Sequence, residues 1–111
     1  MMPERGDLLL IPYPFTDLSA SKRRPVLALT AADAYGDFIA LPVTSRPRPE
    51  SGIPLSQDDM EHGSLPAVSW IRTDRIVTLN GSLVVKSVGR VRERLVAEAV
   101  ERFYARIRGP Q

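Results

Sequence analysis

The side chains best suited to chemistry in this sequence are basic and hydroxyl groups gathered at two places. The run Lys22-Arg23-Arg24 carries three consecutive cations, and Thr44-Ser45-Arg46 forms a second polar cluster. The first run lies between two short apolar segments, Leu8–Ile11 and Val26–Leu29, which predict strands. Basic residues at the mouth of a strand-to-strand connection form a platform for an anionic ligand, and a polynucleotide is the obvious candidate.

Composition excludes several kinds of site. The chain has 111 residues, which fits one domain over 1–111, and it contains no cysteine, so thiolate nucleophiles, disulfides and cysteine zinc sites are excluded. The segment Asp58–His62 has metal-ligand residue types without a ligand-like spacing, so we expect neither a metal site nor a cofactor. The net charge is only +2, which makes the clustering of the cations more informative than their sum.

Nothing in the sequence predicts contact with a membrane. No apolar run approaches the length of a membrane span. The stretch Met1–Asp7 lacks the basic-then-apolar order of a secretory signal. We therefore expect a cytoplasmic protein.

The elements that must position the two polar clusters are short strands followed by one helix. Period-3.6 apolar spacing with charges on the opposite face predicts a helix over Glu93–Arg108, which begins without a good capping residue and ends at Gly109-Pro110. The segment Ser56–Ser64 reads as an acidic loop, and Asn80-Gly81 as a turn. Five to seven strands are expected. The candidate segments are Leu8–Ile11, Val26–Leu29, Asp37–Val43, Gly52–Leu55, Ala67–Arg72, Arg75–Leu79 and Leu83–Val88. The last of these segments forms either a strand or a helical turn followed by a short strand.

This pattern predicts a small, strongly bent antiparallel sheet or half-open barrel capped by a helix. Such a small sheet gains by burying an edge or a face against a second copy of itself, so a homodimer is a reasonable expectation.

The order of the motifs resembles the MazF/PemK (Kid) toxins of type II toxin–antitoxin systems. The resemblance is carried by Arg5-Gly6-Asp7 before the first apolar run, Arg24-Pro25 opening the second, and Pro42-Val43-Thr44-Ser45 ending the third. It extends over nearly the whole chain, through Ser69–Thr78 and Gly89-Arg90-Val91 to the terminal helix. The chain departs from many members before Arg24, where Pro14–Arg23 contains no glycine.

The resemblance implies a mainly β, barrel-like (SH3-like) fold of the CcdB/MazF plasmid-maintenance type, assembled as a homodimer. It implies a metal-independent, sequence-specific endoribonuclease that cleaves single-stranded RNA. It also implies a cognate antitoxin whose disordered acidic tail occupies the RNA groove. In the family, the arginine of Arg-Pro and the threonine after Pro-x are the catalytic pair, and these positions match Arg24 and Thr44. We expect the RNA to be bound by neighbouring polar side chains: Thr16, Ser19, Ser21, Lys22, Arg23, Ser45, Arg46 and Arg72.

The expected reaction is cleavage of RNA by its own 2′-hydroxyl. The planar guanidinium of Arg24 suits two oxygens of a phosphorane, and the hydroxyl of Thr44 can donate to a phosphate oxygen or orient the 2′-hydroxyl. Arginine is a poor general base because its pKa lies above about 12. The proton acceptor is left open among Asp17, Asp74 and solvent.

Plainer interpretations compete with each of these roles. Taken alone, Arg24 fits a surface cation at a strand start, and Thr44 fits a turn residue. Arg72 and Arg75 either line a groove or pair with carboxylates, and Phe38 and Trp70 fit core or dimer packing better than base stacking. At the level of function, the alternatives are a non-enzymatic, gyrase-inhibitor-like poison that grips a protein, and an inactive RNA-binding module on the same fold.

Overall fold

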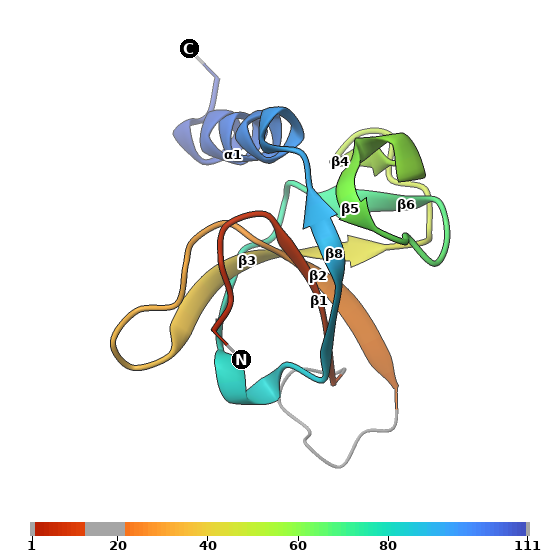
Figure 1. Ribbon diagram of the computed structural model, residues 1–111. Helices are drawn as coiled ribbons and strands as arrows, with labels where there is room; N and C mark the ends of the chain where they lie inside the picture. The colour runs from red at the N-terminus through yellow and green to blue at the C-terminus, as the bar shows by residue number, and fades with distance from the viewer. Residues whose placement is uncertain (1, 13–21, 111) are drawn as a thin grey trace.

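Eight short antiparallel strands and one long helix make up the part of the chain that the computed structural model describes, residues 2–12 and 22–110. Along the sheet the strand order is β4-β6-β3-β2-β1-β8-β5, and β7 pairs with β3 beside this path. The strands curl around one another and α1 lies to one side of them (Figure 1). The elements are β1 (Asp7–Pro12), β2 (Arg23–Ala28), β3 (Asp37–Thr44), β4 (Gly52–Leu55), β5 (Met60–Gly63), β6 (Ser69–Arg72), β7 (Val77–Asn80), β8 (Lys86–Val91), α1 (Glu93–Arg108) and the short 3-10 turns η1 (Gln57–Asp59) and η2 (Gly81–Leu83).

The predicted mainly β fold with a bent antiparallel sheet and a terminal helix is confirmed. The helix spans the predicted residues, and Arg92 at its N-cap position gives no side-chain hydrogen bond to the first turn. Its end is set by Gly109, whose φ of 79° leaves the helical region and whose N–H bonds to the Ala105 carbonyl at 3.2 Å. The helix is not long and apolar enough to span a membrane, and no helix among the described residues is.

The structure corrects one predicted loop and the number of strands, and it decides the alternative left open for the last strand. The segment Ser56–Ser64 is not only loop, because it contains β5, which pairs with β8. In β5 the residues Glu61 and His62 are exposed, so this strand lacks the apolar pattern of a buried strand. For the last strand, the expected alternative of a helical turn followed by a strand is the one found, with shifted residues: η2 is held by the Asn80 side chain, which accepts from the Ser82 N–H, and β8 runs over Lys86–Val91. The expected five to seven strands are therefore eight among the described residues.

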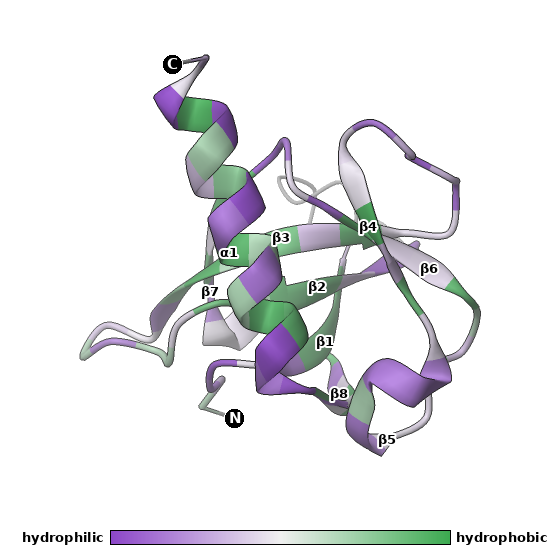
Figure 2. Ribbon diagram, turned by 90° about the horizontal axis from the view of Figure 1, so that it is seen from above, coloured by the Kyte–Doolittle hydropathy of each residue, from purple (hydrophilic) through white to green (hydrophobic). Residues whose placement is uncertain are grey.

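The central strands are buried on both faces, as their continuous apolar runs predict. On one face, α1 packs through Leu95, Val96 and Ala99 against residues such as Leu8 and Leu41. The other face gathers a second cluster around the buried Phe38, which includes Leu9, Ile11, Val26, Ala28, Ala40 and Leu79. Figure 2 shows α1 lying across the strands, with hydrophobic and hydrophilic residues alternating along it. With strands β1 to β3 held between two apolar layers, the ends of those strands are fixed in space.

Candidate functional site

A surface pocket of about 340 Å³ lies where β2, β3 and β6 meet. It takes its walls from the beginning of β2, the end of β3, the connection that follows β3, and the end of β6. The lining residues are Lys22, Arg24, Pro42, Val43, Thr44, Arg46, Arg48, Arg72 and Arg75. Six of these nine side chains are basic and none is acidic, so the pocket is suited to an anion.

The pairing of β2 with β3 explains why Arg24 and Thr44 share this pocket. Val26 pairs with Pro42 and Leu27 with Leu41, and the same register continued toward Arg24 would place it opposite Thr44. The β2–β3 ladder stops before that point, whereas on its other edge β3 pairs with β6 through Val43 and Thr44, opposite Ile71 and Trp70. Arg24 and Thr44 therefore lie just beyond the last paired residues of β2 and β3, and both line the pocket.

Both side chains are half-buried. Arg24 opposes Ile11 across β1 and β2, next to a fully buried part of the sheet. The Thr44 hydroxyl oxygen accepts a hydrogen bond from the Arg46 N–H at 3.2 Å. A hydroxyl that accepts in this way still carries a proton that it can donate to an oxygen atom of a ligand.

Asp74 organises two of the pocket arginines. Its carboxylate accepts from Arg72 Nε at 3.1 Å and from Arg72 Nη2 at 3.0 Å, which is a bidentate pair. Arg48 Nη2 donates to the same carboxylate at 3.2 Å. A single carboxylate therefore holds two guanidinium groups at the pocket wall, and it offsets part of the repulsion between them.

The same contacts decide what Asp74 can do chemically. Hydrogen bonding from Arg72 lowers the Asp74 pKa from its ordinary 3.8 to about 2, and the charges of Arg72 and Arg48 act in the same direction against the opposing effect of burial. A carboxylate with so low a pKa is ionised at neutral pH and accepts protons weakly. Of the proton acceptors considered from the sequence, Asp74 is therefore a poor one, and Asp17 lies outside the described residues.

The pocket contains some of the residues proposed from the sequence and not others. Lys22, Arg46 and Arg72 line it together with the pair Arg24 and Thr44. Arg23 and Ser45 are exposed and do not line it. The structural placement of Thr16, Ser19 and Ser21 cannot be compared with the prediction, because these residues lie outside the described part of the chain.

Two arginines of the pocket are not among the expected RNA contacts, although lining a groove is one of the two roles expected for Arg75. Arg48 and Arg75 line it, each close in sequence to a residue that was predicted, Arg46 and Arg72. Their sequence signal is this clustering of cations, which does not tell a groove cation from a solvated one. The structure makes the distinction for Arg48, because Asp74 anchors its side chain beside Arg72.

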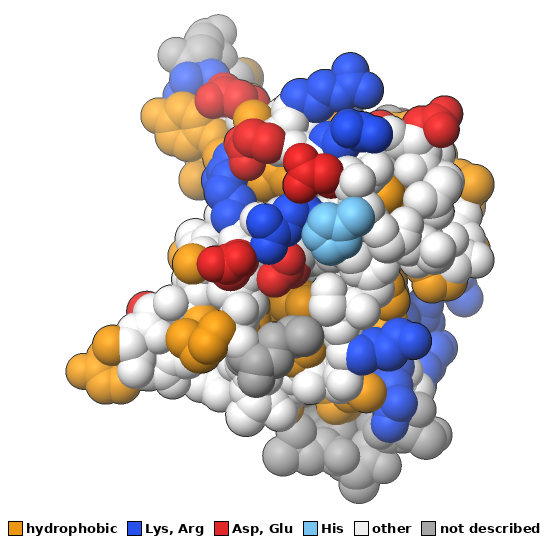
Figure 3. Space-filling view, in the orientation of Figure 1, with side chains coloured by type: hydrophobic (Ala, Val, Ile, Leu, Met, Phe, Trp, Pro, Cys, Tyr) orange, Lys and Arg blue, Asp and Glu red, His pale blue; other side chains and the backbone are white. Residues whose placement is uncertain are grey.

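Charge elsewhere on the surface is more evenly mixed. Over the upper part of the face in Figure 3, acidic and basic side chains are interspersed, in keeping with the ion pairs Arg5–Glu93 at 2.8 Å and Arg90–Asp7 at 3.0 Å. At the lower right of that view, where β2 begins, basic side chains stand without acidic neighbours. The uneven distribution favours the β2 end of the sheet as the anion-binding region.

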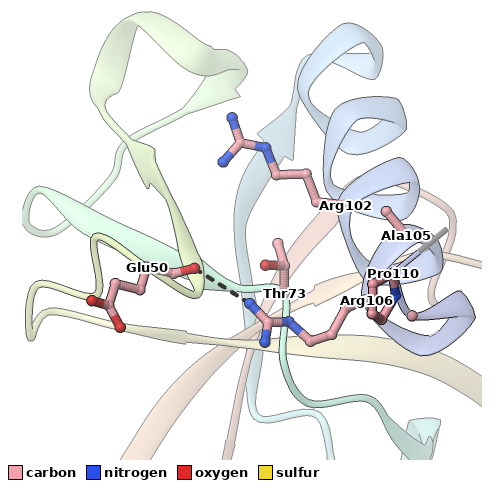
Figure 4. A pocket seen from close by; sticks show the side chains of 7 residues that line it. Glu50, Thr73, Arg102, Ala105, Arg106 and Pro110 are labelled. Carbon is pink, nitrogen blue, oxygen red and sulfur yellow. Dashed lines mark hydrogen bonds between the residues drawn. The ribbon is translucent and has the colours of Figure 1, made fainter.

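A second hollow, of about 490 Å³, lies between α1 and the connection from β3 to β4 (Figure 4). Arg106 Nη2 donates across it to the Glu50 backbone carbonyl at 3.3 Å, and the Thr73 hydroxyl beneath donates to the Ser51 carbonyl at 3.0 Å. Arg102, also in its wall, pairs with Glu98 on the same helix at 3.1 Å. Arg106, Thr73 and Arg102 each have a partner within the protein, so we interpret this hollow as a seam between helix and loop.

Comparison with known proteins points in one direction. Residues 4–105 match the family model described as PemK-like, MazF-like toxin of type II toxin–antitoxin system. Among solved structures, MazF from Deinococcus radiodurans is similar with a TM-score of 0.76 and 19% identity, over 98% of this chain and 99% of that one. An endoribonuclease in complex with its cognate antitoxin, from a Mycobacterial species, has a TM-score of 0.71 and 18% identity, over 98% of each chain. At these identities the structures show the fold alone. A search of curated proteins gives no match.

Proposed function

The chain belongs to the PemK-like, MazF-like toxin family of type II toxin–antitoxin systems, and we propose that it is a metal-independent endoribonuclease that cleaves single-stranded RNA. The observation that carries the proposal is the pocket in which Arg24 and Thr44 meet, surrounded by further cations. Charged donors that are positioned beforehand around a phosphate supply the largest single part of such catalysis.

In the proposed reaction, the 2′-oxygen attacks the adjacent phosphorus atom and the bond from phosphorus to the 5′-oxygen breaks. The products are a 2′,3′-cyclic phosphate and a 5′-hydroxyl end. Arg24 stabilises the charge of the phosphorane and, through water, supplies the proton to the leaving oxygen. Thr44 donates to a phosphate oxygen or orients the 2′-hydroxyl. The proton of the 2′-hydroxyl goes to solvent or to Asp17, since the low pKa of Asp74 makes it a weak acceptor.

The partners follow from the same proposal. A disordered acidic tail of a cognate antitoxin would fill the cationic pocket and compete with RNA there. A homodimer would cover the second half of α1, where Tyr104 is 50% exposed and Ile107 is 64% exposed. The buried residues of the helix, Leu95, Val96 and Ala99, all lie in its first half. We expect the protein to act in the cytoplasm, on messenger RNA.

The test is incubation of the purified protein with a mixed-sequence RNA in the presence of EDTA. We expect products with 5′-hydroxyl ends, a loss of roughly a hundredfold or more in kcat for Arg24→Ala, and a smaller loss for Thr44→Ala that Thr44→Ser restores. Arg102→Ala, which removes a cation from the exposed face of α1, is the matched control and should cleave normally.

Two results would contradict the proposal. One is an RNA substrate that stays intact under all conditions. The other is cleavage that Arg24→Ala leaves unchanged. Growth inhibition that survives Thr44→Ala while cellular RNA stays intact would favour the non-enzymatic, protein-gripping alternative.

A further inference from the structure

Trp70 lies beside the phosphate pocket on the outer side of the sheet. It is paired with Thr44 across β3 and β6, and residues directly opposite one another in an antiparallel pair project from the same face. Arg72, two residues further along β6, projects from that face as well, and both Thr44 and Arg72 line the pocket. The indole therefore stands next to two pocket residues that come from two different strands.

The burial pattern supports this orientation. Ser69 and Ile71 are buried, whereas Trp70 and Arg72 are half-buried, so β6 alternates between the core and the surface. On its other side Trp70 pairs with the exposed Pro54 of β4. It stands between Thr44 and Pro54, as the large aromatic side chain of a surface strip that leads away from the pocket.

A half-buried tryptophan beside a set of phosphate-binding cations has a specific use in a protein that binds single strands. Phosphates are held by the cations, and the unpaired bases splay away from them and stack on aromatic rings. Core packing does not require the side chain here, because the core contacts of β6 come from Ile71 on the opposite side of the strand.

We propose that Trp70 is the stacking platform for an RNA base next to the scissile phosphate, so that the strand runs from the pocket across β6 toward β4. The inference rests on the proposed ribonuclease function and adds a base contact to it. Stacking binds substrate and transition state equally well, so removing the indole raises KM and leaves kcat unchanged.

The sequence offers a direct optical test, since Trp70 is the only tryptophan. The probe is a mixed-sequence oligoribonucleotide with 2′-O-methyl groups, which block cleavage by the 2′-hydroxyl. We expect it to quench the tryptophan emission of the wild-type chain. Inorganic polyphosphate, which has charge but no bases, should compete for the pocket without the same quenching. RNA that binds in a salt-dependent manner without changing the emission would overturn the inference while leaving the proposed function intact.

Affinity measurements supply the second arm. We expect Trp70→Leu to weaken RNA binding by about five- to thirtyfold, the lower part of the range for loss of one stacked base. Trp70→Phe, which keeps an aromatic face and the fit to the sheet, should bind within about threefold of the wild type. The slope of log Kd against log salt should be unchanged in both variants, because no phosphate contact is removed.

Tyr35→Leu is the matched control, since Tyr35 is an 85% exposed aromatic residue that does not line the pocket. Equal affinity of Trp70→Leu and the wild type would overturn the inference. If Trp70→Leu fails to fold, the quenching of the wild-type tryptophan emission and the RNA affinity of Trp70→Phe still test whether Trp70 contacts a base. Absence of any RNA binding by the wild type would overturn the proposed function together with the inference.

Discussion

Replacing Asp74 by asparagine should separate RNA binding from RNA cleavage. The variant keeps an oxygen for Arg72 and Arg48 to contact but removes the negative charge that anchors both guanidinium groups. The substitution removes a negative charge beside the cationic pocket, so we expect RNA affinity to stay equal or rise. The two arginines lose their fixed orientation, so we expect kcat to fall by roughly tenfold.

The stability effect can be worked out from the pKa of Asp74. A drop from 3.8 to about 2 corresponds to about 2 kcal/mol in favour of the charged form. The Asp74 side chain is 21% exposed, so screening by water reduces the expected loss for Asp74→Asn to about 1–2 kcal/mol at pH 7. Because the pKa is lower in the folded than in the unfolded chain, this contribution is complete above pH 3.8 and disappears as the pH falls toward 2.

The assay is urea denaturation at pH 7 and pH 3 together with steady-state cleavage of RNA at pH 7. About half of the stability difference between variant and wild type should be lost at pH 3. Asp58→Asn is the matched control, because Asp58 is an exposed residue of η1 and does not line the pocket. A variant as stable and as active as the wild type at pH 7, or a stability difference that grows on acidification, would refute the reasoning.

Three further predictions test the site and the fold around it. Arg46→Gln should reduce the slope of log Kd against log salt for single-stranded RNA by about 0.7, the value for one lost phosphate contact; an unchanged slope would place Arg46 outside the RNA path. Leu41→Ala removes a fully buried side chain and should lower the free energy of unfolding in urea by about 2–5 kcal/mol, against less than about 0.5 kcal/mol for the 69% exposed Val68→Ala. Gly63→Ala should cost about 2 kcal/mol or more, since Gly63 has a φ of +89° and an added Cβ would meet the Val88 carbonyl; a variant of wild-type melting temperature would argue against the tight β5–β8 contact.

Much of the scaffold could be predicted from local patterns. The residues of α1 follow from apolar spacing along one segment, and the burial of β1 on both faces follows from the continuous run Leu8–Ile11. Both depend on neighbours close in sequence, for which periodicity carries the information. The strand β5 escaped prediction because an edge strand with only Met60 buried has no such pattern.

The sequence by itself determined that Arg24 and Thr44 stand at strand ends, and their family motif named them as a candidate pair. Only the tertiary structure decided that the two side chains share a pocket, because this depends on the register of β2 with β3 and on where that ladder stops. Arg48, Asp74 and Trp70 were brought to the same place by pairings between distant strands and by ion pairs across a connection. Local spacing does not encode those pairings, since register between strands is set by the packing of the whole core.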